Sequence, residues 1–376
     1  MKGKFHSKRT GQFVVITLLL IAIITACGSN IDAEDEEEVE PEESDVMIEE
    51  IEEPEEDPVP EGMAQSPFNG EWIPEEKENK RPIALQINNS TAAYPQSGIA
   101  QADIIYETLA EGNITRLMAV FHLFESEKIG PIRSARHYYL DMAANHDAVY
   151  MHYGGSPQAY SYIRQLNAPN MDGLSWLDGI VCWRDPERRA IPRMLEHSVY
   201  TNGAHLEDGW ERRELRTELK DDFTSGLNFA MEATIPWGQR ADYVSIPFSN
   251  SYTSSFDYDS QTRKYIKYQS GELHMDEEIE EPLMFTNLII QRTDINVIPG
   301  DDAGRREVAI IGNGDGYFIS AGRAVAIEWN KPDYASPTQY IEKKTGKPVL
   351  LNPGKTYIGI LPQGREISFY QPEREH

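Results

Sequence analysis

The sequence predicts an α/β domain built on a largely parallel or mixed sheet, followed by a small β-rich domain. Strand-like and helix-like stretches alternate from residue 81 to residue 240, which is typical of an α/β domain. From residue 241 to residue 376, short strand-like runs separated by turn residues dominate. At 376 residues, the chain is long enough for two domains of ordinary size.

Apolar periodicity and capping residues place the elements of the first domain. Apolar side chains that alternate along the chain predict strands, and those spaced three and four residues apart predict helices. Ser134 and Ser156 are placed to cap two helices, and Pro157 suits a first helical position. The predicted elements are a strand over 82–88, a helix over 97–112, a strand over 114–124, a helix over 135–145, a strand over 147–153 and a helix from 156.

Turn signals divide the second domain into short strands. Ala321-Gly322 and Asn352-Pro353-Gly354 are typical of hairpin turns. The predicted strands are 264–268, 282–291, 308–311, 317–320, 324–329, 349–351 and 356–361.

The N-terminus carries a sorting signal that ends at Cys27. Basic residues lie between positions 2 and 9, and the apolar run Phe13–Ile24 has the length of a secretory signal, too short to span a bilayer. The small residue Ala26 precedes the cysteine. This pattern predicts a bacterial lipobox, in which residues 1–26 are a signal peptide and Cys27 carries diacylglyceryl and palmitate-type chains. The alternatives are an ordinary signal peptide or a signal anchor that contains a cysteine.

The lipobox predicts a lipid-anchored protein on the extracytoplasmic face of the cell membrane, with the membrane as a partner. Residues 27–80 are predicted to be a disordered tether, because residues 32–61 contain 18 acidic residues and no lysine or arginine. This acidic run is either a solvated spacer or an interaction segment. The formal net charge is −27; residues 62–376 hold 31 basic and 44 acidic residues, and this net of −13 disfavours nucleic acid as a partner.

Two loops of the α/β domain carry the residues with the clearest binding chemistry. The first contains Arg133 and Arg136, and the second is His152-Tyr153-Gly154-Gly155-Ser156. Loops that follow neighbouring parallel strands share one edge of a sheet, where ligands usually bind. Guanidinium groups, glycines and helix amino ends suit an anionic envelope ligand or a protein partner. The alternative is that the arginines pair with local acids, namely Glu107, Glu111 or Asp141.

Arg116 joins this site only if its strand runs antiparallel or the sheet is strongly twisted, because Arg116 lies near the start of its strand. The candidate ligand-binding residues are Arg116, Arg133, Arg136, His137, His152, Gly154, Gly155 and Ser156. The histidine spacings match no metal motif, and the Gly-x-Ser-x-Gly elbow of hydrolases does not occur. No catalytic residue, metal site or cofactor is therefore predicted.

Several unusual strings occur in one order along the chain. They are Ala84–Asn89, Pro95–Gly98, Ala102–Glu107, Glu111–Arg116, Gly130–Arg136, His152–Ser156, Trp329–Lys331 and Pro353–Tyr357. In these strings, the sequence resembles the YerB-type bacterial lipoproteins, a two-domain family of unknown function. The resemblance covers nearly everything from Arg81 to Pro362. It implies an envelope lipoprotein with an N-terminal and a C-terminal domain, and it supplies no established reaction.

A second likeness supplies an alternative function. An arginine-marked strand, an Ile-x-Arg loop and a Tyr-Gly-Gly string together resemble the layout of LytR-CpsA-Psr phosphotransferases. The leading hypothesis is a lipid-anchored binding or accessory protein of the cell envelope. The alternative is a phosphotransferase that acts on polyprenyl-pyrophosphate-linked glycans.

Overall fold

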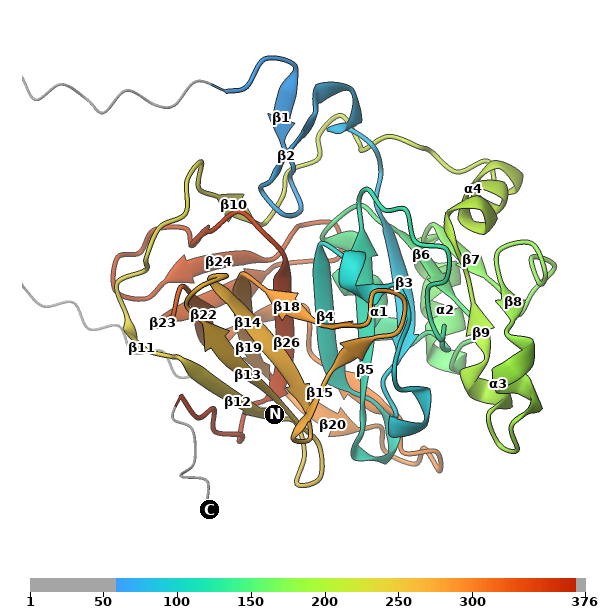
Figure 1. The fold of residues 1–376 in the computed structure, drawn as a ribbon. Helices are drawn as coiled ribbons and strands as arrows, with labels where there is room; N and C mark the ends of the chain where they lie inside the picture. Colours follow the sequence, from blue (N-terminus) through green and yellow to red (C-terminus); the bar gives the residue numbers. More distant parts are fainter. Residues whose placement is uncertain (1–58, 370–376) are drawn as a thin grey trace, which may run out of the picture. The chain divides into compact units, whose positions relative to one another are not determined.

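One large mixed sheet organises residues 59–369, the part of the chain that the computed structural model describes (Figure 1). Its eleven strands are hydrogen-bonded in the order β11-β23-β22-β19-β26-β4-β5-β3-β6-β7, and β24 also pairs with β23. Their bounds are β3 Ile83–Asn88, β4 Ile104–Leu109, β5 Thr115–Phe121, β6 Val149–His152, β7 Asn170–Asp172, β11 Gln239–Arg240, β19 Asn287–Thr293, β22 Gly312–Ser320, β23 Arg323–Lys331, β24 Gln339–Glu342 and β26 Thr356–Pro362.

A second, antiparallel sheet comes from the C-terminal region. Its strands are β12 Tyr243–Pro247, β13 Thr253–Asp259, β14 Lys264–Gln269, β15 Glu272–Leu273 and β18 Met284–Phe285. The remaining strands form two-stranded pairs: β1 Met63–Gln65 with β2 Trp72–Pro74, β8 Trp183–Arg184 with β9 Val199–Tyr200, β10 Asn228–Phe229 with β25 Leu350–Leu351, β16 Met275–Asp276 with β17 Glu281–Pro282, and β20 Ile295–Val297 with β21 Arg306–Val308.

Helices are short and lie mostly in the N-terminal region. The α-helices are α1 His137–Ala144, α2 Pro157–Leu166, α3 Pro186–Ala190 and α4 Gly203–Arg212. The 3-10 turns are η1 Glu75–Lys77, η2 Thr91–Ala93, η3 Ile99–Gln101, η4 Glu111–Asn113 and η5 Leu195–His197. None of the helices within residues 59–369 is both long and apolar enough to span a bilayer.

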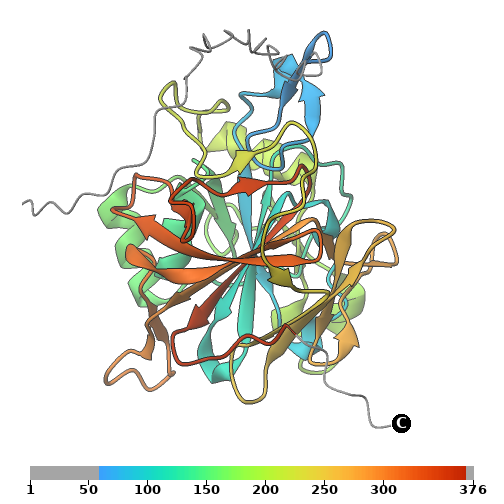
Figure 2. The same cartoon turned by 90° about the vertical axis from the view of Figure 1, so that its left-hand side faces the viewer.

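Alternate residues of the central strands face two different cores. In β3, Ile83 and Leu85 belong to a core shared with the second sheet, whereas Ala84 belongs to a core shared with α1 and α2. Every residue of β3, β4 and β5 is buried, because both faces of the large sheet are covered. Three layers result, with α1 and α2 on one face of the large sheet and β12–β15 on the other (Figure 2).

The two regions of the sequence share the large sheet. Strand β26 runs parallel to β4 on one side and to β19 on the other, so Tyr357 lies opposite both Ile105 and Leu288. The predicted class is confirmed: a mixed sheet with a few helices comes first, and a region rich in antiparallel strands follows. Continuous pairing across β4 and β26 makes one body of the two regions.

The helix predicted over 97–112 is wrong, because this stretch forms η3 and the strand β4. The apolar residues that suggested a helix are buried on both faces of the sheet, which hides the alternation that marks a half-exposed strand. The predicted cap on α1 also differs, because the N-cap is Arg136 rather than Ser134. Ser156 does cap α2, since its Oγ accepts a hydrogen bond from the Ala159 N–H at 3.1 Å.

Part of the segment predicted as tether, residues 59–80, is folded. Strands β1 and β2 pair within the segment predicted as tether, and Phe68 between them is fully buried in the core. A buried aromatic residue supplies the apolar surface that the acidic run lacks. Residues 1–58, which include the predicted signal peptide, Cys27 and most of the predicted tether, lie outside the described residues.

Candidate functional site

The two loops predicted to share a sheet edge lie side by side. The Ala135 N–H donates to the carbonyl of Gly154 at 2.9 Å, and the Ser156 N–H donates to the carbonyl of Ala135 at 3.1 Å. The Tyr153 N–H donates to the carbonyl of Arg133 at 3.0 Å. The arginine loop therefore pairs with the segment that leads into α2.

Strand direction brings Arg116 to this edge. Strand β5 runs antiparallel to both of its neighbours, so Arg116 lies opposite Asn88 at the end of β3 and opposite Thr108 near the end of β4. The condition stated for Arg116, that its strand runs antiparallel, is therefore met, and Arg116 lies at the edge that carries the two loops. The Arg116 guanidinium donates to the carbonyl of Ser134 at 2.7 Å.

Arg116 and Arg136 converge on one carboxylate, that of Glu111 in η4. Arg116 Nη2 lies 3.2 Å from Glu111 Oε2, and Arg136 Nη2 donates to the same oxygen at 2.9 Å. Arg136 Nε donates to Glu111 Oε1, which makes the Arg136 pair bidentate. Of the three acids that the sequence offered as partners, Glu111 is the one that both arginines contact.

Arg133 lies at the more exposed end of the cluster. Its Nη2 donates to Glu196 Oε2 at 2.7 Å, and the side chains of Arg133 and Glu196 are 23% and 59% exposed. Arg116 and Arg136 are far less exposed, at 9% and 10% of their side chains. Arg133 is therefore the arginine that solvent and solutes can reach.

The electrostatics of the cluster follow from its burial. Burial, followed by the charge of Arg136, lowers the pKa of Arg116 to about 10, although Glu111 acts in the opposite direction. Burial would raise the pKa of Glu111, but its hydrogen bond to Arg136 and the charges of Arg116 and Arg136 leave it below its ordinary value. Three guanidinium groups thus face two carboxylates, Glu111 and Glu196, which leaves one positive charge in excess.

The other predicted site residues have structural partners. His137 Nε2 lies 3.0 Å from Glu307 Oε2, at the start of α1. His152 is fully buried, and its Nδ1 lies 2.8 Å from the carbonyl of Gly154. Burial lowers the pKa of His152, although Asp172 opposes the shift. Asp172 also accepts from the Gly154 N–H at 2.8 Å, so these contacts hold the shape of the loop.

Gly154, Gly155 and Ser156 form the turn into α2. Gly154 has a φ of +71°, a conformation that favours glycine. A Cβ on Gly155 would lie 3.5 Å from that of Ala135, so this glycine closely faces the arginine loop. Ser156 serves as the helix cap described above.

Sequence reasoning missed two charged residues near the cluster. Glu196 is remote in sequence and was not assigned to Arg133. Arg306 comes from β21, and its Nη2 donates to Asn113 Oδ1 at 2.6 Å beside Glu111. No local sequence signal identifies either residue, because both contacts depend on tertiary packing.

The other two acids offered as partners belong elsewhere. Asp141 accepts a hydrogen bond from the Tyr162 hydroxyl at 2.9 Å. Glu107 is fully buried and lies 3.3 Å from Lys267 Nζ, which is fully buried as well. Glu107 also accepts hydrogen bonds from the hydroxyls of Ser254 and Tyr357, both at 2.8 Å. Within residues 59–369, no group of three or more His, Cys, Asp and Glu side chains is arranged to hold a metal ion.

Comparison with known proteins places this chain in a family. Residues 68–216 match the N-terminal domain, and residues 244–358 the C-terminal domain, of a protein of unknown function (DUF3048). The chain is 30% identical over 302 residues to "Putative lipoprotein YerB" of Bacillus subtilis (strain 168), covering 79% of this chain and 86% of that protein.

The crystal structure of the YerB protein from Bacillus subtilis has the same fold. Its TM-score is 0.70 at 28% sequence identity, and the match covers 81% of this chain and 99% of that chain. These matches give no support to the phosphotransferase alternative. Two matched domains and a relative covered over most of its length show that the chain belongs to the YerB family of DUF3048 proteins.

Proposed function

We propose that this protein is a lipid-anchored binding or accessory protein of the cell envelope, which recognises an anionic group through Arg133. The observation that carries the proposal is the excess positive charge of the arginine cluster, where three guanidinium groups face two carboxylates. The name of the Bacillus relative supports the lipoprotein part of the proposal. Cys27 is the proposed lipidation site, on the extracytoplasmic face.

The roles of the three arginines differ. Arg116 and Arg136 are fixed by Glu111 and supply a positive potential at the sheet edge. Arg133 is held by Glu196, whose exposed carboxylate accepts from Nη2 and whose main-chain carbonyl accepts from Nη1 at 3.4 Å, and an exposed ion pair of this kind contributes little to stability. A ligand carboxylate or phosphate can replace Glu196 on the Arg133 fork, because the guanidinium binds either group in the same bidentate geometry.

Calorimetric titration with inorganic pyrophosphate tests the anion site. The unlipidated chain from residue 28 is used, at low ionic strength, because screening by salt weakens such contacts. Replacing Arg133 with alanine is expected to weaken binding by about tenfold, since a charge-assisted contact of ~1.5 kcal/mol is lost. The matched control is Arg164→Ala on α2, which removes the same charge from an exposed position away from Glu111.

The proposal fails if Arg133→Ala binds pyrophosphate as tightly as the parent chain. It also fails if Arg164→Ala weakens binding equally, because net charge rather than the site would then be responsible.

The anchor is tested separately in cells. Cys27→Ala is expected to move the protein from the membrane fraction to the soluble extracytoplasmic fraction, because two acyl chains account for stable attachment. Persistent membrane association of this variant would show that the uncut apolar segment is the anchor instead.

A further inference from the structure

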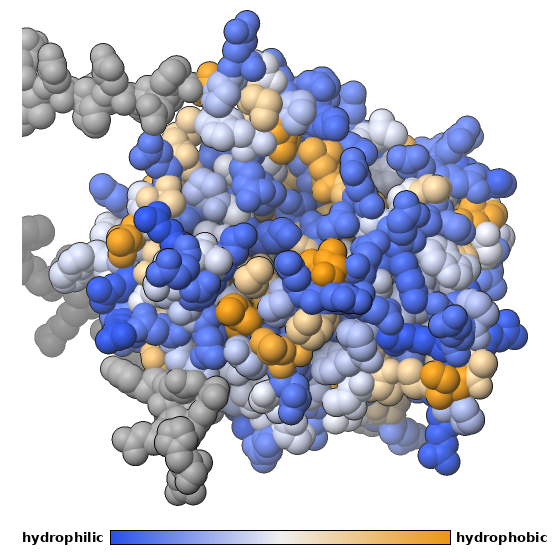
Figure 3. Space-filling view, viewed as in Figure 1, coloured by the Kyte–Doolittle hydropathy of each residue, from blue (hydrophilic) through white to orange (hydrophobic). Residues whose placement is uncertain are grey.

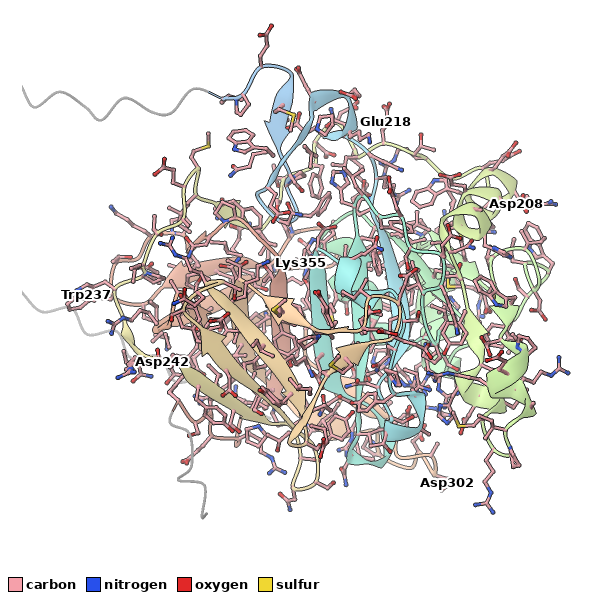
Figure 4. All side chains as sticks on the ribbon, in the orientation of Figure 1. Asp208, Glu218, Trp237, Asp242, Asp302 and Lys355 are labelled. Carbon is pink, nitrogen blue, oxygen red and sulfur yellow. The ribbon has the colours of Figure 1, made fainter. Side chains whose placement is uncertain are left out.

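The segment between β10 and β11 exposes large apolar side chains. Met231, Ile235 and Trp237 are 45%, 74% and 83% exposed, and we call these three residues the apolar tip. Figure 4 shows Trp237 projecting from the outside of the molecule, away from the two sheets. A tryptophan this exposed is unusual in a folded protein, because leaving its large apolar surface in water is unfavourable.

The tip is held firmly from both sides. The Thr234 N–H donates to Asn352 Oδ1 at 2.6 Å, and Asn352 Nδ2 donates to the Thr234 carbonyl at 2.8 Å. After the tip, Gly238 packs so closely on β23 that an added Cβ would lie 2.1 Å from the carbonyl oxygen of Ala324. With Pro236 between these two points, the apolar side chains project from a fixed backbone.

Two lysines of the turn between β24 and β25 flank the apolar tip. Lys344 Nζ lies 3.3 Å from the centroid of the Trp237 ring, and Lys347 belongs to the same turn. Neither lysine has a carboxylate within ion-pair distance among the residues that the structure describes. Glu232 is the only acidic residue between Met231 and Gly238. Glu342, where the turn begins, accepts a hydrogen bond from the Thr345 hydroxyl, so Lys344 and Lys347 are the charged groups beside the tip that an anionic surface could contact.

The N-terminal part of the described chain meets the base of the tip. Gln65 in β1 donates from Nε2 to the carbonyl of Ala230 at 2.8 Å, directly before Met231. Gly70 packs against the ring of Phe229, where an added Cβ would lie 2.5 Å from a ring carbon. The N-terminal strand of the described chain, β1, therefore lies next to the base of the tip.

We propose that the apolar tip docks on the outer surface of the membrane, where it meets anionic phospholipid headgroups. Tryptophan favours the interface between headgroups and acyl chains, and lysines beside it bind headgroup phosphates. The proposal rests on the proposed anchoring through Cys27. The part of the predicted tether that precedes the described residues, 27–58, has 32 residues, and a flexible tether of that length would span only roughly 30 Å. The lipid would therefore keep the membrane at high effective concentration near the tip.

A membrane fits the tip better than a protein partner does. Stable protein interfaces present a broad surface of about 800 Å² on each partner. Apolar side chains on the face shown in Figure 3 instead form small separate groups among polar ones. A few projecting side chains with flanking lysines are enough for interfacial insertion, where each contributes by entering the headgroup region.

Vesicle co-sedimentation tests the docking proposal. The chain from residue 28 is mixed with vesicles of phosphatidylcholine alone or with added phosphatidylglycerol. The parent chain is expected to bind the anionic vesicles, and the double replacement Ile235→Ser with Trp237→Ser is expected to lower the partition coefficient by about tenfold. Replacing Lys344 and Lys347 with alanine is expected to remove the preference for anionic vesicles.

The matched control is Leu174→Ser with Trp176→Ser. Leu174 and Trp176 are 57% and 59% exposed, so the control removes similar apolar residues from another surface. Vesicle binding of this control is expected to equal that of the parent chain. All replaced side chains are exposed, so folding is expected to be retained, and circular dichroism checks it.

The proposal is overturned if the parent chain binds neither vesicle, or if Ile235→Ser with Trp237→Ser binds as well as the parent. Loss of self-association in that variant, without vesicle binding by the parent, would assign the tip to a second copy of the chain and also overturn it. The anchor and anion site are measured separately, by Cys27→Ala and Arg133→Ala. A failed tip therefore leaves the proposed function standing, and failure of the anchor or of the anion site is recognised by these separate measurements.

Discussion

The Glu107 carboxylate and the Lys267 ammonium form an ion pair at 3.3 Å, although both side chains are wholly buried. Glu107 belongs to β4 of the large sheet and Lys267 to β14 of the second sheet. Lys267 Nζ also donates to Gln269 Oε1 at 2.8 Å and lies 3.1 Å from His274 Nδ1. Burial lowers the pKa of Lys267, whereas the charge of Glu107 opposes the shift. The pair therefore links the two sheets.

Glu107→Gln is expected to destabilise the protein strongly. The change leaves the buried Lys267 ammonium without its counter-charge, which costs about 3–5 kcal/mol of the free energy of unfolding. Adding Lys267→Met is expected to recover part of the loss, because the unpaired charge is then removed. Urea unfolding of the single and double variants measures this coupling.

An exposed ion pair provides the control for the Glu107 and Lys267 variants. Lys343 and Glu328 lie 3.9 Å apart with side chains 41% and 68% exposed, so Lys343→Ala is expected to leave the unfolding midpoint unchanged. If Lys343→Ala lowered the free energy of unfolding as much as Glu107→Gln, burial would not explain the effect of the Glu107 change.

Glu111→Gln is expected to destabilise the sheet edge. The amide keeps a similar shape but removes the one carboxylate that Arg116 and Arg136 share. Two largely buried guanidinium groups would then repel each other, at a cost of about 3–5 kcal/mol. Urea unfolding measures the loss, and an unchanged midpoint would show that the two arginines do not depend on Glu111.

Glu196→Gln is expected to strengthen pyrophosphate binding. Glu196 competes with the ligand for Arg133, and neutralising it frees the guanidinium fork. Because an exposed ion pair contributes at most about 1 kcal/mol, the gain in affinity is expected to be up to about fivefold. The same calorimetric titration measures it, and weaker binding by this variant would indicate that Glu196 contacts the ligand itself.

Acid is expected to destabilise the protein through its buried histidines. Burial lowers the pKa of His146 to about 3 and that of His122 to about 4. In the unfolded chain, histidine takes up a proton near pH 6.5, whereas the folded protein does not. The contribution of each neutral histidine to the free energy of unfolding is therefore fully present above pH 6.5. It falls by about 1.4 kcal/mol per pH unit as the pH drops toward the pKa of the folded state.

His146→Gln isolates one of these groups. Between about pH 6 and pH 4, the free energy of unfolding of the variant is expected to depend less steeply on pH, by the contribution of one proton. Urea unfolding at several pH values measures this slope. Burial raises the pKa of Asp103 to about 7, which gives an opposite slope, but this slope is present in both proteins and cancels in the comparison. Equal slopes in the parent and the variant would contradict the buried neutral state of His146.

The sequence allowed prediction of the fold class and of one sheet edge for the two loops, although β5, the strand before the arginine loop, is antiparallel to β3 and β6 rather than parallel as expected. These features depend on local signals, namely alternating apolar residues, glycines and the Ser156 cap. The direction of β5 is set by its pairing with distant strands, so local sequence signals do not predict it. The placement of Arg116 depends on that direction. Strand β4 was mistaken for a helix because Ile105 and Leu109 face one core while Ile104 and Tyr106 face the other.

The partners of the charged residues could not be predicted for a related reason. Glu107, Glu111 and Asp141 are all close to the arginines in sequence, yet Glu111 is the one that contacts both Arg116 and Arg136. Lys267 reaches Glu107 from 160 residues away. The packing of the sheets determines which charged residues pair, and this packing cannot be predicted from residue spacing or composition.

The position of β26 in the large sheet affects how the chain can fold during synthesis. Strand β26 is the last strand within residues 59–369, yet it lies in the interior of the sheet, between β4 and β19. Until residues 356–362 emerge, β4 has an unpaired edge that can pair with another chain. Pairing of the large sheet is therefore completed only after residues 356–362 have been synthesised, and a chain truncated before β26 would present an aggregation-prone edge.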